Sequence, residues 1–197
     1  MSTKRVTKSL LDSWLYSFKR DDGYEDFLCT LRREKKPPTE AMLNGIRYEN
    51  CLNSVLNGES IPEDHEWYSP ITEMAEELQG SQQQVVLFHD IEVDGQPILL
   101  HGVLDYLRAG LIWDCKFSKT YHLNKYYWEY TTQTAMYFAL VPEARVFRYI
   151  ISDGNYVYRE TYPREIVPDI SLQIRQFLSY LKKHDLYEIY EEKWRVQ

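Results

Sequence analysis

Cysteine is scarce in this chain, and its few cysteines form no close pair. Cys29, Cys51 and Cys115 are widely spaced along 197 residues, and no CxxC motif joins any two of them. An odd and scattered set of this kind favours reduced thiols over disulfides or a zinc site. We therefore expect a protein of a reducing compartment, the cytoplasm.

Long apolar runs are also missing. No stretch of the sequence approaches the length that is needed to cross a membrane. The early apolar residues between positions 10 and 15 are interrupted by Asp12 and Ser13, which is not the pattern of a signal peptide. The sequence therefore predicts no membrane partner and no secretory leader.

Positive charge is in the minority. Lysine and arginine number 23 against 30 aspartates and glutamates, which gives a formal net charge of -7. This argues against a surface that binds nucleic acid non-specifically over its whole area, so phosphate contacts must come from a local basic patch or from bound metal. The acidity is equally compatible with a role in solubility alone. The densest basic run, residues 32–36, is either a phosphate contact or a solvated helix end, and the helix dipole favours the second.

Apolar and aromatic residues, in contrast, are plentiful. Hydrophobic residues make up 44% of the chain and aromatic residues 15%, which is typical of a chain that folds. The length fits one domain over residues 1–197. We expect a mainly helical N-terminal part (1–80), a sheet core (83–165) and a C-terminal helix with a tail (166–197).

The periodicity of the apolar residues predicts both helices and strands. Helical spacing covers residues 9–19, 24–33, 39–58, 71–78 and 170–181, and Thr39 is placed to cap the third of these helices. Strands are expected at residues 85–88, 98–103, 146–151 and 156–161. We expect an α/β fold with a central mixed β-sheet flanked by helices and an active site on one sheet edge. His89 and His101 are interpreted as structural.

An acidic hairpin lies at the centre of the predicted sheet. Two apolar runs meet at Gly110, which supplies the turn conformation that other residues resist. Asp105 and Asp114 would then lie on neighbouring strands. A carboxylate in an apolar strand is costly to bury unless something pairs with it, so two that face each other indicate a bound cation. Lys116 shares the strand face of Asp114.

These residues carry a resemblance to a known family. Asp105, followed by Asp114-Cys115-Lys116, resembles the metal-binding hairpin of the PD-(D/E)XK nuclease superfamily. Residues 133–137 match the Gln-x-x-x-Tyr signature of its RecB-like exonuclease branch, which includes phage recombination exonucleases and CRISPR adaptation nucleases. Residues 45–49 match the Gly-x-x-x-Glu segment of the same branch. The four motifs stand in the family's order between about residues 40 and 160, which is more specific than any one of them.

The resemblance implies a restriction-endonuclease-like core and a metal-dependent DNA nuclease. It implies a catalytic set of Glu49, Asp105, Asp114, Lys116, Gln133 and Tyr137. The carboxylates of this set and the backbone carbonyl of Cys115 would hold Mg²⁺ or Mn²⁺. Some relatives bind an iron–sulfur cluster on four cysteines, and this chain has too few for one.

Individual residues of the set have simpler interpretations. Lys116 would orient the attacking water or stabilise the phosphate, or it would only form a salt bridge with Asp114 or Asp105. Gln133 would position the nucleic-acid backbone or the carboxylates, or it would be an ordinary buried amide. Glu49 on its own would be an exposed helix residue. Gly45 costs its helix about 1 kcal/mol relative to alanine, which suggests that another backbone or a ligand approaches closely there.

The loop at residues 117–130 interleaves cations with aromatic residues. Lys119, Lys125 and Tyr121 are therefore candidates for contacts with a nucleic-acid strand, through phosphates and base stacking. The aromatic residues could equally belong to the core.

Three functions remain open from the sequence. The first is an exonuclease that acts on linear DNA or single-stranded ends in phage or prophage recombination, repair or CRISPR adaptation, with a recombination or repair protein or a second copy of itself as partner. The second is a non-catalytic nucleic-acid-binding or assembly subunit that keeps the nuclease fold. The third is a sequence-specific endonuclease, which the Gln-x-x-x-Tyr signature disfavours.

Overall fold

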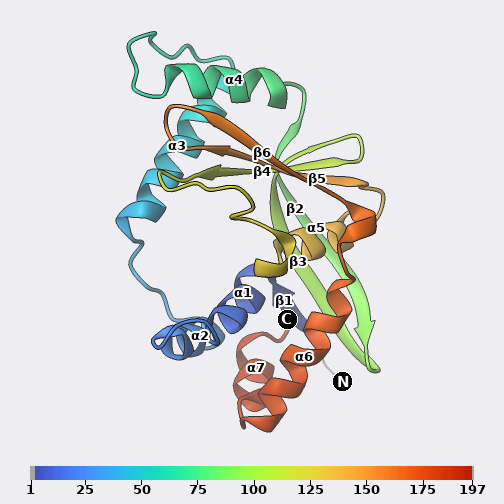
Figure 1. Cartoon of the computed structure of the whole chain (residues 1–197). Coiled ribbons are helices and arrows are strands. Elements are labelled where there is room, and N and C mark those ends of the chain that lie inside the picture. Colours follow the sequence, from blue (N-terminus) through green and yellow to red (C-terminus); the bar gives the residue numbers. More distant parts are fainter. Residues whose placement is uncertain (1–2, 197) are drawn as a thin grey trace.

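A computed structural model describes residues 3–196, apart from the side chain of Trp128. A mixed six-stranded sheet is flanked by helices, which confirms the predicted α/β class (Figure 1). The strands are β1 (Lys4–Thr7), β2 (Gln82–Val93), β3 (Gln96–Arg108), β4 (Leu111–Phe117), β5 (Val146–Ser152) and β6 (Val157–Pro163). The helices are α1 (Lys8–Tyr16), α2 (Gly23–Leu31), α3 (Glu40–Leu56), α4 (Tyr68–Leu78), α5 (Gln133–Leu140), α6 (Ile170–Lys183) and α7 (Tyr187–Lys193), with short 3-10 turns at Trp128–Tyr130 and Arg164–Ile166.

Strand β3 organises the sheet because it has three partners. Along one edge it pairs with β2 in an antiparallel ladder. Along its other edge it pairs first with β1, in parallel, at residues 98–101, and then with β4, antiparallel, at residues 106–108. Among the residues that the structure describes, none pairs as a strand with residues 102–105 on that edge, between these two ladders. The sheet splits at Asp105.

The turn between β3 and β4 is the one that the sequence predicts. Ala109 and Gly110 both have positive φ angles, 39° and 82°, which is the left-handed conformation that glycine adopts at least cost. Beyond β4 the chain returns through α5 to β5, which is parallel to β4, and β6 follows antiparallel to β5. The predicted N-cap of α3 is also confirmed, since the Thr39 side chain accepts a hydrogen bond from the Met42 amide.

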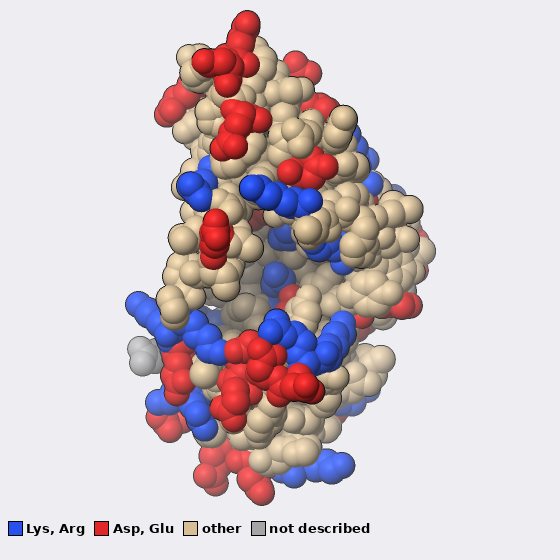
Figure 2. All heavy atoms as spheres, turned by 60° about the vertical axis from the view of Figure 1, so that its left-hand side comes forward, with Lys and Arg blue, Asp and Glu red and all other residues tan. Residues whose placement is uncertain are grey.

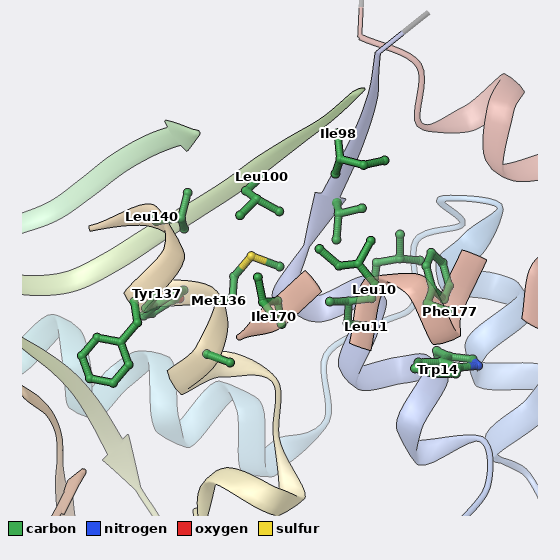
Figure 3. Close-up of a cluster of buried hydrophobic side chains, with 14 of the residues drawn as sticks. Leu10, Leu11, Trp14, Ile98, Leu100, Met136, Tyr137, Leu140, Ile170 and Phe177 are labelled. Atoms are coloured by element: carbon green, nitrogen blue, oxygen red, sulfur yellow. The ribbon is translucent and has the colours of Figure 1, made fainter. Parts of the chain in front are cut away.

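Two apolar clusters lie around this sheet. In the first, β3 packs against α1, α5 and α6, and Figure 3 shows Ile98 and Leu100 meeting Met136 and Leu10 there. The second cluster lies under α3 and α4. The strand partners Tyr106 and Trp113 belong to it, as do residues of both helices. The two clusters fix the helices that carry the candidate site residues.

Residues 4–7 form β1, a short strand that no local pattern predicts, ahead of the four helices α1 to α4. Two expectations about the fold need correction. The C-terminal tail contains a further helix, α7. The acidic hairpin occupies β3 and β4, which are internal strands, so the candidate site is not on a sheet edge. None of the helices in residues 3–196 is long and apolar enough to cross a bilayer.

Candidate active site

Asp105 lies where β3 separates from its neighbours. The ladder to β4 ends at the pair Tyr106 and Trp113, one residue short of Asp105 and Asp114. The Asp105 side chain spans the gap, because its Oδ2 accepts a hydrogen bond from the Cys115 amide at 2.9 Å. The Asp105 carboxylate thus accepts the hydrogen bond that a backbone carbonyl of β3 would accept in a regular ladder. This bond holds Asp105 close to Asp114, as the sequence predicts.

Asp114 is the most enclosed acid of the site, with 2% of its surface exposed. Its Oδ1 accepts a hydrogen bond from the Gln133 amide nitrogen on α5. Its Oδ2 forms an ion pair with the Lys116 ammonium, which shares its strand face as expected. Burial alone would lower the pKa of Lys116, but the negative charges of Asp114 and Asp105 outweigh burial and hold that pKa well above its usual value. Lys116 therefore stays an ammonium ion at neutral pH.

The pKa of Asp105 is raised well above its ordinary value. Burial is the main cause and the negative charge of Asp114 is the second, while Lys116 acts in the opposite direction and Glu49 adds a smaller increase. Each of these charges must lie near Asp105 to act on it. The structure therefore gathers Glu49, Asp105, Asp114 and Lys116 into one electrostatic unit.

Glu49 enters this unit from α3. It is half-buried, and its Oε1 accepts a hydrogen bond from the Gln84 amide nitrogen at 2.8 Å. Burial and then the charge of Asp114 raise its pKa. Gln84 has a φ of 49° and interrupts the ladder of β2, and its part in the site has no sequence signal beyond a run of three glutamines. Gly45 does not serve a close backbone approach, since a Cβ there would meet no atom within 4 Å.

Gln133 is held from behind by a residue that sequence reasoning missed. The Tyr149 hydroxyl lies 3.5 Å from Gln133 Oε1, at the outer limit of a hydrogen bond, and Tyr149 is the β5 partner of Asp114. The Tyr126 ring covers Tyr149, with 5.1 Å between ring centroids. The amide of Gln133 is thereby oriented with its nitrogen towards Asp114. The parallel pairing of β4 and β5 could not be read from the sequence, so Tyr149 had no visible link to the site.

Tyr137 acts on the unpaired segment of β3. Its hydroxyl donates a hydrogen bond to the Val103 carbonyl at 2.8 Å, which satisfies an acceptor that has no strand partner on that edge. The backbone at Gly102 comes close enough to α5 that a Cβ there would lie 2.6 Å from Leu140 Cδ1 and 3.2 Å from Tyr137 Cε1. Tyr137 therefore supports the strand that carries Asp105, and its hydroxyl is not directed at a carboxylate.

The donor set fits a hard divalent cation in part. No group of three or more His, Cys, Asp or Glu side chains within residues 3–196 is close enough to enclose an ion. Two carboxylates are nonetheless a common number of protein ligands for Mg²⁺, because the ion keeps several water ligands. Asp114 Oδ2 is buried, and its ion pair with Lys116 is the contact it makes within the described part of the chain. Asp105, Asp114 and the Cys115 carbonyl are therefore suitable ligands for such an ion. Glu49 lies nearby and is hydrogen-bonded to the Gln84 amide.

Figure 2 shows the molecule from the side on which α2 and α3 lie in Figure 1. A hollow opens on this face, with basic and acidic side chains in its wall and several lysines or arginines along its rim. A separate cavity of about 590 Å³ lies at the β3–β4 turn and is lined by Gly110, Glu143 and Arg145 among others. That cavity contains none of the candidate site residues.

The three residues proposed for nucleic-acid contact in the loop at 117–130 differ in their surroundings. Lys125 donates hydrogen bonds to Ser118 and Thr120, and the Tyr121 hydroxyl donates to Glu160. Lys119 is exposed beside a cavity of about 400 Å³ that Trp67 and Asp153 also line. Their role with nucleic acid stays a prediction, and Lys119 is the most accessible of the three.

Comparisons with known proteins bear on the fold. No protein-family model matches the chain, and no curated protein matches it. Among solved structures, the chain is similar to the crystal structure of SSO0001. The two share a TM-score of 0.56 and 14% sequence identity, over 93% of this chain and 77% of the other. At this level of identity the likeness shows a common α/β fold and nothing about activity.

Proposed function

We propose that this chain is a metal-dependent DNA nuclease that hydrolyses phosphodiester bonds, acting as an exonuclease on linear DNA or single-stranded ends. The observation that supports it most is that Asp105 and Asp114 lie together where β3 and β4 separate. Lys116 forms an ion pair with the Asp114 carboxylate. A buried acid and a half-buried acid held together against their own repulsion are a costly arrangement that a purely structural core would not need.

The chemistry of the site follows from its charges. A divalent ion bound by Asp105, Asp114 and the Cys115 carbonyl would lower the pKa of water and neutralise charge on the phosphate. Lys116 would act as a hydrogen-bond donor and a positive charge, because the neighbouring carboxylates raise its pKa. It would release Asp114 to bind a non-bridging phosphate oxygen or to orient the attacking water. The hydrogen bond from Gln133 would keep the Asp114 carboxylate in one orientation when Lys116 moves.

The decisive experiment compares purified wild type with Asp114→Asn on linear single-stranded, linear double-stranded and circular DNA with Mn²⁺. We expect wild type to degrade the linear substrates, and the variant to lose at least about a hundredfold of the rate. Asp64→Asn, which removes an exposed loop carboxylate, is the matched control. Equal cleavage of circular DNA would indicate an endonuclease, and no cleavage of any substrate would refute the proposal.

A second candidate is a non-catalytic nucleic-acid-binding or assembly subunit. It is favoured by the full occupation of the Asp114 carboxylate, whose two oxygens are already held by Gln133 and Lys116. This candidate predicts DNA binding that is unchanged by Asp114→Asn and that needs no metal. Under the primary proposal the enzyme would work in the cytoplasm in recombination, repair or CRISPR adaptation, with a repair or recombination protein or a second copy as partner.

A further inference from the structure

One face of the long β2–β3 hairpin is bare. The alternate residues Val86, Phe88 and Val103 point away from the core beneath α5 and α6, and they are 55%, 53% and 37% exposed. The strand register places Val86 opposite Val103 and Phe88 opposite His101, whose ring stacks on Phe88 at 4.7 Å between centroids. These four side chains form a contiguous strip, the bare strip, which the described residues leave open to solvent.

The bare strip begins at the candidate active site. On β2, Gln84 precedes Val86 by two residues, and its amide is bonded to Glu49. On β3, Val103 precedes Asp105 by two residues. Residues two apart along a strand are about 7 Å apart, so the strip starts within one side-chain length of the acids.

At its other end the bare strip meets arginines. The Arg5 guanidinium lies 5.9 Å from the centre of the Phe88 ring, and the parallel pairing of Arg5 with Leu99 puts it on the same face. Burial and the positive charges of Arg5 and Arg33 together lower the pKa of His101. A cavity of about 370 Å³ at this end is lined by Arg5, Arg33, Glu192, Lys193, Trp194 and Arg195.

This arginine cluster is not neutralised within the described chain. Glu192 is paired with Lys193, and no carboxylate of residues 3–196 forms an ion pair with Arg5, Arg33 or Arg195. The Nε of Arg5 is buried and has no hydrogen-bond partner. Arg33 donates a hydrogen bond to the Lys193 carbonyl and lies over the buried Trp194 ring, so it keeps its full positive charge. In a chain with a net charge of -7, arginines without a carboxylate partner, one of which lies over the exposed Phe88 ring, are complementary to an anionic ligand that also has flat apolar faces.

We propose that the bare strip and its arginine cluster bind a single strand of DNA that continues from the candidate active site. Unpaired bases pack against the mutually stacked rings of Phe88 and His101, of which Phe88 is exposed. Phosphates contact Arg5, Arg33 and Arg195. The acids Asp90 and Glu92, further along β2, mark where the strand leaves the face. The identity of the ligand rests on the proposed nuclease function.

The test measures binding separately from cleavage. Fluorescence anisotropy of a labelled oligothymidylate is recorded in EDTA, so that no strand is cut, for wild type, Phe88→Ala and Arg195→Ala. Loss of one base stack should weaken binding about tenfold in Phe88→Ala. Loss of one phosphate contact should reduce the slope of log K against log salt by about 0.7 in Arg195→Ala. Leu172→Ala and Lys183→Ala, exposed on α6, are matched controls and should bind like wild type.

Each result has one meaning, provided that circular dichroism shows the variants folded. Unchanged binding by both Phe88→Ala and Arg195→Ala would refute DNA binding by the bare strip, even if wild type degrades DNA with Mn²⁺. Weaker binding by both would support the strip, even if wild type degrades nothing, in which case only the nuclease proposal fails. Loss of a wild-type dimer in Phe88→Ala, with unchanged DNA binding, would show that the face is an interface between two copies and would also overturn it.

Discussion

At the scale of single residues, the site is built from acids that need a counter-charge. Asp114 is held by Gln133 and Lys116, whereas among the described residues the Cys115 amide is the hydrogen-bond donor to Asp105. Burial, and then the negative charge of Asp114, raise the pKa of Asp105, so ionising this carboxyl is the costly step within the pair.

Ionisation of Asp105 should be visible in the pH dependence of the free energy of unfolding. Because its pKa is higher in the folded state than the unfolded value of about 3.9, the folded state holds this proton more tightly, and the free energy of unfolding falls as pH rises above about 4. Asp105→Asn keeps an oxygen for the Cys115 amide and cannot ionise. We expect it to be more stable than wild type at pH 7 to 8 without metal, by at least about 1 kcal/mol.

Urea unfolding of both proteins across the pH range in EDTA is the measurement. The two free energies should converge at low pH, where Asp105 is protonated in the folded state. Parallel curves would show that Asp105 ionises as freely in the folded state as in the unfolded one.

At the scale of elements, two glycines give opposite expectations for the same substitution. Gly23 begins α2, and a Cβ there would lie 2.6 Å from the Tyr16 carbonyl oxygen and 2.9 Å from Ser17 Cα, both backbone atoms. Gly23→Ala should therefore cost about 1–3 kcal/mol. Gly45 lies inside α3 with open space around it, so Gly45→Ala should gain up to about 1 kcal/mol.

Thermal unfolding of the two variants measures both effects, each serving as control for the other. Nuclease activity then adds a second readout for Gly45. A variant that is more stable but inactive would indicate that a ligand approaches α3 at this point, whereas full activity would leave Gly45 without a functional role.

The loop at residues 117–130 is anchored by one buried acid. Glu160, 4% exposed, accepts hydrogen bonds from the Tyr121 and Tyr162 hydroxyls and from the Tyr126 amide. Glu160→Ala would leave three donors without partners and should cost about 2–4 kcal/mol. Glu165→Ala, an exposed neighbour, should cost less than about 0.5 kcal/mol. Equal denaturant midpoints for these two variants would contradict this account.

Local patterns predicted what depends on neighbours in the sequence. The turn at Ala109 and Gly110, the cap at Thr39 and the shared face of Asp114 and Lys116 follow from turn chemistry, capping and strand alternation. The pairing of β1 with β3 and of β4 with β5 joins segments far apart in the chain, and no local pattern specifies it. For this reason β1, Gln84 and Tyr149 were missed, and the candidate site was expected on a sheet edge.

At the scale of the whole molecule, a bound ion would link the two parts of the sheet. Asp105 belongs to the strand that β1 and β2 share, and Asp114 to the ladder of β4, β5 and β6. Under the proposed function, Mn²⁺ at about a hundred times its dissociation constant should stabilise the folded protein by about 2.7 kcal/mol.

Melting temperatures with and without Mn²⁺ test this expectation, with Asp114→Asn as the variant that should not respond. Wild type should shift upward at neutral pH and lose the shift as the pH falls and the carboxylates take up protons. An equal shift in wild type and Asp114→Asn would place the ion elsewhere on the acidic surface.

The bond from the Cys115 amide to the Asp105 carboxylate also has a consequence for hydrogen exchange. Amides in the regular ladders are protected by neighbouring carbonyls, and their exchange reports the opening of whole strands. The Cys115 amide is protected by a side chain that can rotate away while the strands stay paired. Its deuterium uptake should therefore follow the state of one carboxylate, which makes this amide a built-in probe of whatever binds between β3 and β4.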